Sequence, residues 1–313
     1  MRVPGTQAGA RRSGRRRSIG TAGPLEALLW LGPALVLILG VVVYPVIALV
    51  TSSFGEFSIT GLRKGDAGLD NYAKFLTSDD LPKVIGNTVV WVGAVVLITL
   101  VLSLGLAQFL SKEFIGRRVV RWAVIVPWAA ALVITSQLFR LMFDYYHGII
   151  NQLLLGLGLI REPVDWLGNP QFTMPSMIAV GVFVSIPFTA YLFLAGLNGI
   201  PDDVYEAASI DGARAWQVYT GITLPLLRPA ILIGIVLNMI YVFNSFPIIW
   251  ILNGSNPGYG NDTLITYMYK LAFRSADHDV GLSAAAGVFN VLLIMIAVAV
   301  YLRFVNWREE KRA

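Results

Sequence analysis

The amino-acid sequence predicts an all-α, polytopic membrane protein with six transmembrane helices. Of its 313 residues, 56% are hydrophobic and only 14% are charged, whereas soluble domains average about 45–50% and about 25%. Six stretches without a charged side chain reach or approach the roughly 20 residues that a helix needs to cross a bilayer. They are Ala27–Gly55, Gly86–Ser111, Trp122–Phe139, Trp166–Pro201, Pro229–Asn261 and Val280–Leu302.

Prolines punctuate these predicted spans, for example Pro45, Pro127, Pro187 and Pro247. An interior proline removes a backbone hydrogen bond that lipid cannot replace, so the freed carbonyl must face protein or a wet cavity. Two interpretations of these prolines stay open: they kink the helices for packing, or they line a polar cavity.

The distribution of Lys and Arg predicts the orientation of the spans. The segments before the first span and after the second, fourth and sixth hold 16 of these residues, and the other segments hold 8. Because cytoplasmic loops carry the excess of positive charge, the richer side is predicted to be cytoplasmic, with both termini inside. The net charge of +5 therefore indicates membrane topology and contact with anionic lipid, and no nucleic-acid partner is expected.

Several kinds of functional site have no support in the sequence. No Asp, Glu, Lys or Arg lies deep in a predicted span, although ion-coupled carriers usually need one there. The sequence has no phosphate-binding GxxxxGK[ST] loop, no nucleophile elbow, no HExxH pair and no cysteine, and both His147 and His278 fall in predicted loops. If the chain moves a solute, the energy is expected to come from another polypeptide.

The predicted external loops carry structure of their own. The loop from Glu56 to Ile85 mixes charges with turn signals, which favours short helices and turns. The segment HGIINQLLLGLGLI, within the loop from Arg140 to Asp165, is too short to span and too apolar to be free in water, so it predicts an interfacial or re-entrant helix. The last external loop, Asn253–Asp279, begins with the turn-rich run NGSNPGYGND.

The cytoplasmic segment Gly199–Arg228 has the pattern of two short helices joined by a tight turn. DDVYEAASI predicts the first helix, with Asp202 and Asp203 favoured in its first turn by the helix dipole. Gly212 permits a sharp turn, and ARAWQVYTGI predicts the second helix. Small side chains on the first helix would let another protein surface approach closely. The alternative, an amphipathic helix lying on the membrane, suits the aromatic residues of the second helix but not the acids and alanines of the first.

This segment resembles the EAA loop of ABC importer permeases, whose pattern is EAA, three residues, Gly, nine residues and Ile-x-Leu-Pro. The matching residues are Glu206, Ala207, Ala208, Gly212, Ile222, Thr223, Leu224 and Pro225. Further segments, such as LDNYAKFL, VDWLGNP and FNSFPIIWILNG, are similar to the carbohydrate-uptake branch of that family and more to its maltose F-type subunit than to its G-type partner. The resemblance extends over about Leu31–Arg303.

The resemblance implies a type I ABC importer permease fold in a bacterial inner membrane. It implies that the EAA loop is a coupling helix seated in a cytoplasmic ATPase, with Glu206 paired to a basic residue and Ala207, Ala208 and Gly212 giving the close fit beside Leu224 and Pro225. It also implies a second homologous permease, an ATPase dimer and an extracytoplasmic sugar-binding protein as partners. The chain itself would bind no cofactor, because ATP and Mg would be held by the ATPase subunits.

A sugar pathway needs amide and hydroxyl partners beside flat aromatic faces. Candidate residues near the EAA loop are Trp128 after Pro127, Ser185 and Phe188 three apart in the fourth span, and Asn238, Tyr241 and Ser245 at i, i+3 and i+7 in the fifth, with Asn244 nearby. The resemblance implies a substrate site on these same helices near the middle of the bilayer. The alternative is that the Asn and Ser side chains join helices and the aromatic rings only pack.

The predicted organisation is a basic cytoplasmic arm over 1–23, a permease domain over 24–306 with its coupling loop at 199–228, and a cytoplasmic tail over 307–313. The predicted function is that of a transport subunit, not an enzyme, in a carbohydrate importer, with glycerol phosphate as a neighbouring substrate class. A stand-alone secondary carrier or channel would need a buried coupling residue, and a membrane-embedded enzyme would need catalytic residues at suitable spacing.

Overall fold

The computed structural model of the protein describes residues 24–254, 258–275 and 278–310. The predicted arm over 1–23 and the last three residues of the predicted tail lie outside the described residues. The chain divides into two compact units, the first ending at Ala48 and the second beginning at Leu49.

The first span contains a widened turn ahead of a proline. Its elements are α1 (Pro24–Leu37), the π-helix η1 (Ile38–Val43) and α2 (Tyr44–Ser53), which continues into the second unit. The N–H of Tyr44 donates to the carbonyl of Leu39, five residues back. Because Pro45 has no N–H, the regular ladder cannot continue through it, and the π-turn accommodates the gap. The apolar helix Leu28–Ser53 is long enough to cross a membrane.

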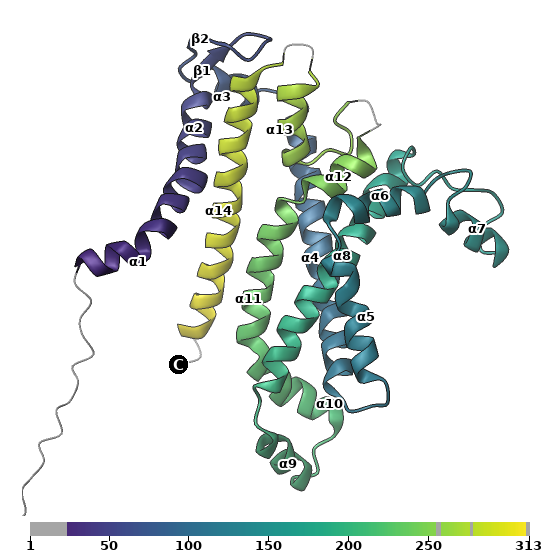
Figure 1. Ribbon diagram of the computed structural model, residues 1–313. Helices are drawn as coiled ribbons and strands as arrows, with labels where there is room; N and C mark the ends of the chain where they lie inside the picture. Colours follow the sequence, from purple (N-terminus) through teal and green to yellow (C-terminus); the bar gives the residue numbers. More distant parts are fainter. Residues whose placement is uncertain (1–23, 255–257, 276–277, 311–313) are drawn as a thin grey trace, which may run out of the picture. The chain divides into compact units, whose positions relative to one another are not determined.

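The second unit is built almost entirely from helices (Figure 1). In chain order it contains β1 (Gly55–Phe57), β2 (Arg63–Asp66), α3 (Asp70–Leu76), α4 (Leu81–Ser111), α5 (Arg117–Ala129), α6 (Leu132–Met142), α7 (Ile149–Gly156), α8 (Pro170–Asn198), α9 (Asp202–Ile210), α10 (Ala215–Val218), the π-helix η2 (Tyr219–Thr223), α11 (Leu224–Phe243), α12 (Phe246–Asn253), α13 (Leu264–Phe273) and α14 (Val280–Glu310). The helix α14 thus includes the first residues of the predicted tail.

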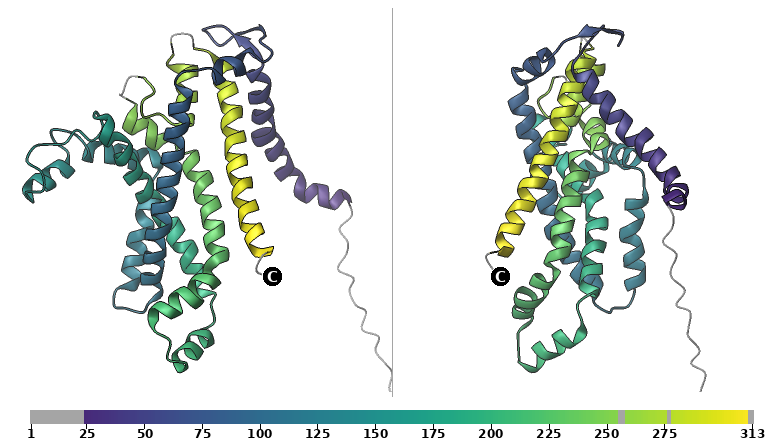
Figure 2. Two further views of the ribbon diagram at one scale, coloured as in Figure 1. Left: turned by 180° about the vertical axis from the view of Figure 1, so that it is seen from behind. Right: turned by 90° about the vertical axis from the view of Figure 1, so that its left-hand side faces the viewer.

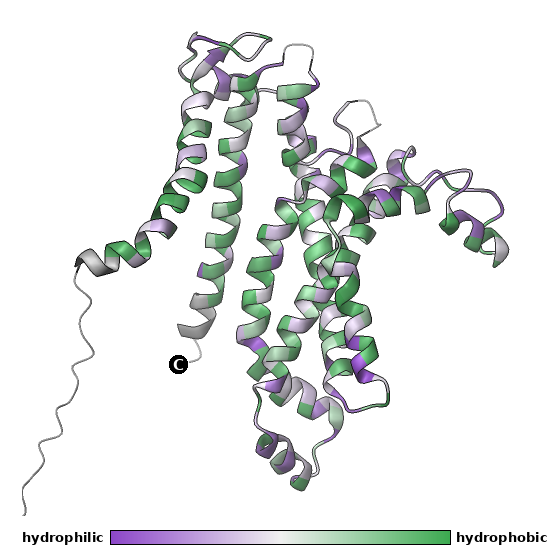
Figure 3. Cartoon of the chain, viewed as in Figure 1, coloured by the Kyte–Doolittle hydropathy of each residue, from purple (hydrophilic) through white to green (hydrophobic). Residues whose placement is uncertain are grey.

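The predicted all-α fold is confirmed. The described residues contain five helices long and apolar enough to cross a membrane, and six if the bent pair α5–α6 is one span. Within the second unit, α4, α8 and α11 pack against one another. Figures 1 and 2 show that α9 and α10 lie beyond one end of these helices, whereas α3, the two strands and α13 lie at the other. Figure 3 shows that apolar residues dominate the long helices of this unit.

The third predicted span is not one continuous helix, which corrects the expected run Trp122–Phe139. The helices α5 and α6 meet at a bend of 97°. Pro127 lies near the end of α5, and Ala130 and Ala131 are extended. Since a proline cannot donate to the preceding turn, the helix ends within one turn of it and α6 begins in a new direction.

The fifth predicted span, Pro229–Asn261, is also interrupted. The helix α11 ends at Phe243, and α12 begins again at Phe246 with Pro247 in its first turn. A proline is tolerated at that position because the N–H it lacks would have no intrahelical partner there. The fourth span, in contrast, continues through Pro175 and Pro187 as the single helix α8.

The first external loop contains an antiparallel strand pair that the sequence analysis did not predict. Gly55 pairs with Asp66, and the register shifts at a bulge between Glu56 and Phe57. All four residues of β2 are exposed, so the strand lacks the alternation of apolar and polar residues that would reveal it. The short helices expected in this loop include α3, which lies within the segment LDNYAKFL. Its buried Asn71 donates to the carbonyls of Ser53 and Gly55 at 3.0 and 2.9 Å.

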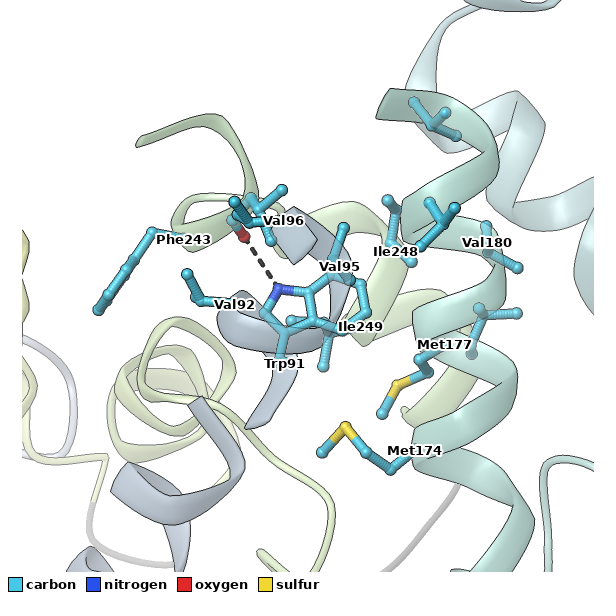
Figure 4. Packing of buried hydrophobic residues seen from close by; sticks show 14 of the residues in the cluster. Trp91, Val92, Val95, Val96, Met174, Met177, Val180, Phe243, Ile248 and Ile249 are labelled. Carbon is cyan, nitrogen blue, oxygen red and sulfur yellow. Dashed lines mark hydrogen bonds between the residues drawn. The ribbon is translucent and has the colours of Figure 1, made fainter. Parts of the chain in front are cut away.

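The main hydrophobic core surrounds Trp91 of α4 (Figure 4). A Cβ on Gly181 of α8 would lie 2.7 Å from Trp91 Cη2, so glycine permits the close approach of α4 and α8. Trp91 Nε1 donates to the carbonyl of Val242 at 2.9 Å. That carbonyl lies in the last turn of α11, where the regular helical donors run out, and it also accepts from the N–H of Ser245 at 3.2 Å. The break after Phe243 is therefore stabilised from α4.

A buried ionic cluster ties Asp262 to α12 and α13. Asp262 Oδ1 accepts from Asn253 Nδ2 at 3.1 Å, and Oδ2 lies 2.6 Å from Lys270 Nζ, an ion pair whose angles are not those of a hydrogen bond. Lys270 Nζ also donates to the carbonyl of Gly258 at 2.7 Å. Asn87 of α4 donates to the carbonyl of Asp262 at 3.0 Å. We call Asn253, Asp262 and Lys270 the Asp262 cluster.

Candidate functional site

A cavity of about 230 Å³ lies among α5, α8 and α11. Its lining residues are Trp128, Val184, Ser185, Phe188, Thr189, Leu237, Asn238 and Tyr241. Five of the seven residues predicted for a substrate pathway are among them: Trp128, Ser185, Phe188, Asn238 and Tyr241. Residues from three helices that are far apart in the sequence therefore meet at one place.

The aromatic wall of the cavity joins α5 to α8. Trp128 lies directly after Pro127 in the last turn of α5, where the span bends. Its ring stacks on Phe188 with centroids 6.2 Å apart and an interplanar angle of 20°. Both rings and Tyr241 are exposed. Flat, exposed aromatic faces beside polar groups suit the apolar faces of a sugar ring.

The polar wall of the cavity is only partly hydrogen-bonded. Asn238 Nδ2 donates to Thr189 Oγ1 at 2.7 Å, and Thr189 Oγ1 donates to the carbonyl of Ser185 at 2.9 Å. Asn238 and Ser185 are only 3% and 4% exposed, yet Asn238 Oδ1 and Ser185 Oγ have no hydrogen-bond partner within the described part of the chain. We call Ser185, Thr189 and Asn238 the Asn238 cluster.

Two predicted pathway residues do not line the cavity. Asn244 and Ser245 follow the end of α11, so the expected helical stripe from Asn238 to Ser245 is broken. Asn244 Nδ2 donates to the carbonyl of Ile240 at 2.9 Å, and Ser245 Oγ donates to that of Tyr241 at 3.0 Å. Both side chains thus bind the last turn of α11, which corrects the predicted position of Ser245 on a continuous stripe.

Thr189 also lies in the cavity wall, although it was not predicted from the sequence. It lies four residues after Ser185 on the same helix, a spacing that puts both side chains on one face. The sequence alone reveals that spacing. It does not reveal the hydrogen bond to Asn238, because that bond joins α8 to α11.

The predicted EAA loop forms the short helix α9 and a tight turn. Gly212 has φ of +70°, a conformation that glycine adopts at little cost. The N–H of Gly212 donates to the carbonyl of Ser209, and that of Ala213 donates to Ala208, at 3.1 and 3.0 Å. This pattern is a Schellman motif, which ends a helix and fixes the direction of the following chain. The predicted role of Gly212 in the turn is confirmed.

A shallow groove lies on the surface of α9 and the turn. Its lining residues are Asp203, Val204, Ala207, Ala208, Asp211, Ala213 and Ile222. Of the residues predicted for coupling, Ala207 and Ala208 line it, whereas Glu206 is an exposed neighbour on the same helix. Leu224 and Pro225 lie at the start of α11, outside the groove. Ile210 and Trp216 are highly exposed apolar side chains beside the groove.

The second half of the loop continues directly into a span. The predicted short helix ARAWQVYTGI is the beginning of an unbroken helix, Ala215–Phe243, made of α10, η2 and α11. The hydroxyls of Tyr205 and Thr223 lie 3.4 Å apart and join α9 to this helix. A displacement of α9 would therefore reach Asn238 through one continuous helix.

Comparisons with known proteins agree with this architecture. A model of the family described as binding-protein-dependent transport system inner membrane components matches residues 99–310. A probable ABC transporter permease protein of Brucella suis biovar 1 is 39% identical over 280 residues, covering 89% of this chain and 96% of that protein. The trehalose/maltose transport system permease protein MalF of Thermococcus litoralis is 32% identical over 278 residues, covering 89% and 92%.

A solved structure shares the fold. A chain in the crystal structure of a bacterial alginate ABC transporter, in complex with an alginate pentasaccharide-bound periplasmic protein, superposes with a TM-score of 0.76 at 24% identity. The match covers 88% of this chain and 93% of that chain. The likeness confirms the predicted permease fold.

Proposed function

This chain belongs to the family of binding-protein-dependent transport system inner membrane components, and from that premise we propose that it forms half of the translocation pathway of an ATP-driven carbohydrate importer. The family match confirms the resemblance on which the EAA loop was interpreted. The chain is a multi-pass permease subunit of an ABC importer. We further propose which solute it carries, how it is oriented in the membrane and what its individual residues do.

The cavity of the Asn238 cluster supports a sugar as the solute. An exposed, stacked aromatic pair lines the same cavity as buried amide and hydroxyl oxygens that have no hydrogen-bond partner among the described residues. A carbohydrate supplies hydroxyl groups for these oxygens and apolar ring faces for the aromatic pair. The permease MalF, a relative at 32% identity, is named for trehalose and maltose.

The size of the cavity supports a site shared with a second subunit. About 230 Å³ falls below the roughly 300–1,000 Å³ of a complete small-molecule site. Trp128, Phe188 and Tyr241 are also exposed, so the cavity is open to whatever covers it. A second homologous permease facing this surface would complete the site.

The groove on α9 supports docking of a separate ATPase. Small side chains allow close approach, two aspartates at the groove offer charge to a basic partner, and Ile210 and Trp216 offer apolar area to bury. The ATPase dimer would bind ATP and Mg, and its closure would move α9 and the helix Ala215–Phe243. Binding of ATP shifts such a system between two states only through its different affinity for each.

Docking of an ATPase on α9 would also set the orientation of the chain in the membrane. The end of the second unit that carries α9 would face the cytoplasm, in agreement with the excess of Lys and Arg there, and both termini would be inside. The opposite end, with α3 and the strand pair, would meet an extracytoplasmic binding protein. The alginate transporter chain with the same fold was solved with such a periplasmic protein.

The substitution Glu206→Lys tests the coupling role. Glu206 is exposed and makes no ion pair among the described residues, so its replacement should leave insertion and folding intact. We expect ATPase subunits to be lost on co-purification and uptake to fall at least tenfold. Glu162→Lys, which reverses an exposed charge after α7, is the matched control and should transport normally. Normal uptake by Glu206→Lys would contradict the assignment.

A further inference from the structure

The hydroxyl of Thr189 fixes which end of the Asn238 amide is free for a ligand. A threonine hydroxyl has one proton and two lone pairs. The Thr189 hydroxyl donates that proton to the carbonyl of Ser185 at 2.9 Å, so it can only accept from Asn238. It accepts from Asn238 Nδ2 at 2.7 Å. The amide nitrogen is therefore held by Thr189, and the amide oxygen remains for the cavity.

The free polar atoms of the cavity wall suit a hydroxyl group better than an anion. Asn238 Oδ1 can only accept a hydrogen bond, and it has no partner among the described residues. Ser185 Oγ, which is also unpaired within those residues, can donate or accept. A sugar hydroxyl satisfies both atoms, because it donates one hydrogen bond and accepts others. An ionised carboxylate has only acceptors, so it would leave Asn238 Oδ1 unpaired and be repelled by it.

The cavity wall also offers an anion no positive charge. All eight residues that the structure places in this wall are uncharged. The helix α8 contains no Lys, Arg or His, and the nearest cation along α5 or α11 is Arg121, seven residues before Trp128 and about 10 Å away along the helix axis. The faces of the Trp128 and Phe188 rings carry partial negative charge. An anionic group buried here would therefore be unpaired, which is costly.

Resting on the proposed function, in which the solute occupies this cavity, we infer that this half of the pathway selects neutral sugars over anionic ones and that Thr189 is the positioning residue for that selection. Thr189 acts through Asn238, because it holds the amide with its oxygen free to accept from a sugar hydroxyl. Without the Thr189 hydroxyl the amide can turn. Its nitrogen then offers donors to an anionic group, and the preference for a neutral sugar falls.

Matched pairs of single-ring sugars test the preference in the unchanged protein. Methyl glucoside and methyl glucuronide differ only at carbon 6, which bears a hydroxymethyl group in the first and a carboxylate in the second, and the galactose pair differs in the same way. Saturation-transfer difference NMR on the full-length chain in phosphatidylcholine nanodiscs measures both affinities without a sugar-headed detergent. We expect the neutral member of a pair to bind at least about tenfold more tightly at neutral pH.

The outcomes for the unchanged protein separate the selection from the proposed function. Equal affinities, or tighter binding of the anionic sugars, would overturn the selection and leave the proposed import of carbohydrate standing. Binding of none of the four sugars would overturn both the selection and the proposed sugar site in this cavity.

Variants of Thr189 test how the preference arises. Thr189→Val keeps the shape of the side chain but removes the hydroxyl, so the ratio of the two affinities should fall about tenfold, toward one. Thr189→Ser keeps the hydroxyl and should keep the ratio. Thr173→Val is the matched control on the same helix, because the buried Thr173 hydroxyl donates to the carbonyls of Leu167 and Asn169 and does not line the cavity. This control should keep the ratio even though it loses hydrogen bonds.

The ratio of affinities distinguishes positioning from a general structural role. Loss of packing in Thr189→Val would weaken both members of a pair equally, and an unchanged ratio would overturn the role of Thr189. An equal fall of the ratio in Thr173→Val would overturn it as well. Thr189→Ala removes the same hydroxyl with a smaller side chain and should also lower the ratio, so the test does not depend on the folding of one variant.

Discussion

The two buried polar clusters of this molecule differ in how completely their atoms are paired. In the Asp262 cluster, both carboxylate oxygens and the ammonium of Lys270 have partners within the fold. In the Asn238 cluster, the amide nitrogen is paired, but Asn238 Oδ1 and Ser185 Oγ are not, within the described residues. Both clusters are almost fully buried, so exposure does not explain the difference.

The difference separates a stabilising cluster from one that is suited to a ligand. A buried polar atom without a partner costs about 1–3 kcal/mol, whereas a paired one contributes. The Asp262 cluster gains its pairs from α12, α13 and the carbonyl of Gly258, and so ties Asp262 and Gly258 to these helices. The Asn238 cluster lines a cavity. Its unpaired oxygens cost free energy, and hydrogen bonds from a hydroxyl-bearing solute would remove that cost. Under the proposed function, stability and binding would therefore depend on different polar groups.

The largest expected effect comes from breaking the Asp262 cluster. Lys270→Met leaves a carboxylate that is buried and unpaired, and also removes the donor to Gly258. Loss of one partner of a buried ion pair costs about 3–5 kcal/mol, so the free energy of unfolding should fall by that amount. Thermal unfolding in detergent, followed by tryptophan fluorescence, measures it.

Two further variants separate the ion pair from the side chain. Lys74→Met removes an exposed lysine from α3 and should change stability by less than about 0.5 kcal/mol. Asp262→Asn combined with Lys270→Met removes both charges and should recover part of the loss. If Lys270→Met proves as stable as the unchanged protein, the contrast between the two clusters fails.

A smaller effect on stability, with a large effect on transport, is expected from Asn238→Leu. The substitution removes an amide whose oxygen is already unpaired, so stability should change by no more than about 1 kcal/mol. Loss of a hydrogen bond to the solute, at about 1–1.5 kcal/mol, should lower sugar uptake about tenfold. Asn290→Leu is the matched control, because Asn290 Oδ1 is also buried and unpaired within the described ranges but does not line the cavity. Unchanged uptake kinetics in Asn238→Leu would remove this residue from the pathway.

The sequence predicts the elements of this fold better than their breaks. Charge-free length predicts the spans because the bilayer sets a minimum that no loop satisfies by chance. The bend after Pro127 and the break at Asn244 depend on what replaces the lost backbone bonds. At Val242 the local N–H of Ser245 is joined by Nε1 of Trp91, about 150 residues earlier in the chain, and no local pattern encodes this second donor. The pair β1–β2 was missed because its second strand is wholly exposed and polar.

The coupling loop and the cavity also differ in how far the sequence alone predicts them. The turn at Gly212 is local, and its Schellman hydrogen bonds follow from the glycine position in the motif. The cavity combines three helices, yet Trp128, Phe188 and Asn238 were predicted from residue chemistry and from their distance to the motif. Ser245 was misplaced because a stripe at i, i+3 and i+7 assumes an unbroken helix, and α11 ends at Phe243.

The smallest effect, and the sharpest test of the contrast, is expected from Ser185→Ala. Ser185 Oγ is buried in the cavity wall and has no hydrogen-bond partner among the residues that the structure describes, so removing the hydroxyl should raise the free energy of unfolding by about 1 kcal/mol. The sugar concentration that half-maximally stimulates ATP hydrolysis by the assembled importer should rise about threefold, which corresponds to a loss of under about 1 kcal/mol in binding free energy.

Thr189→Val is the matched control on the same helix face. Its hydroxyl accepts from Asn238 and donates to the carbonyl of Ser185, so this variant should lose about 1 kcal/mol of stability. The two substitutions should change the free energy of unfolding in opposite directions. This result is expected only if the Thr189 hydroxyl is hydrogen-bonded within the fold and the Ser185 hydroxyl is free to bind a ligand. A loss of stability in Ser185→Ala would mean that this hydroxyl is already paired, and the cavity would then be a packing defect rather than a binding site.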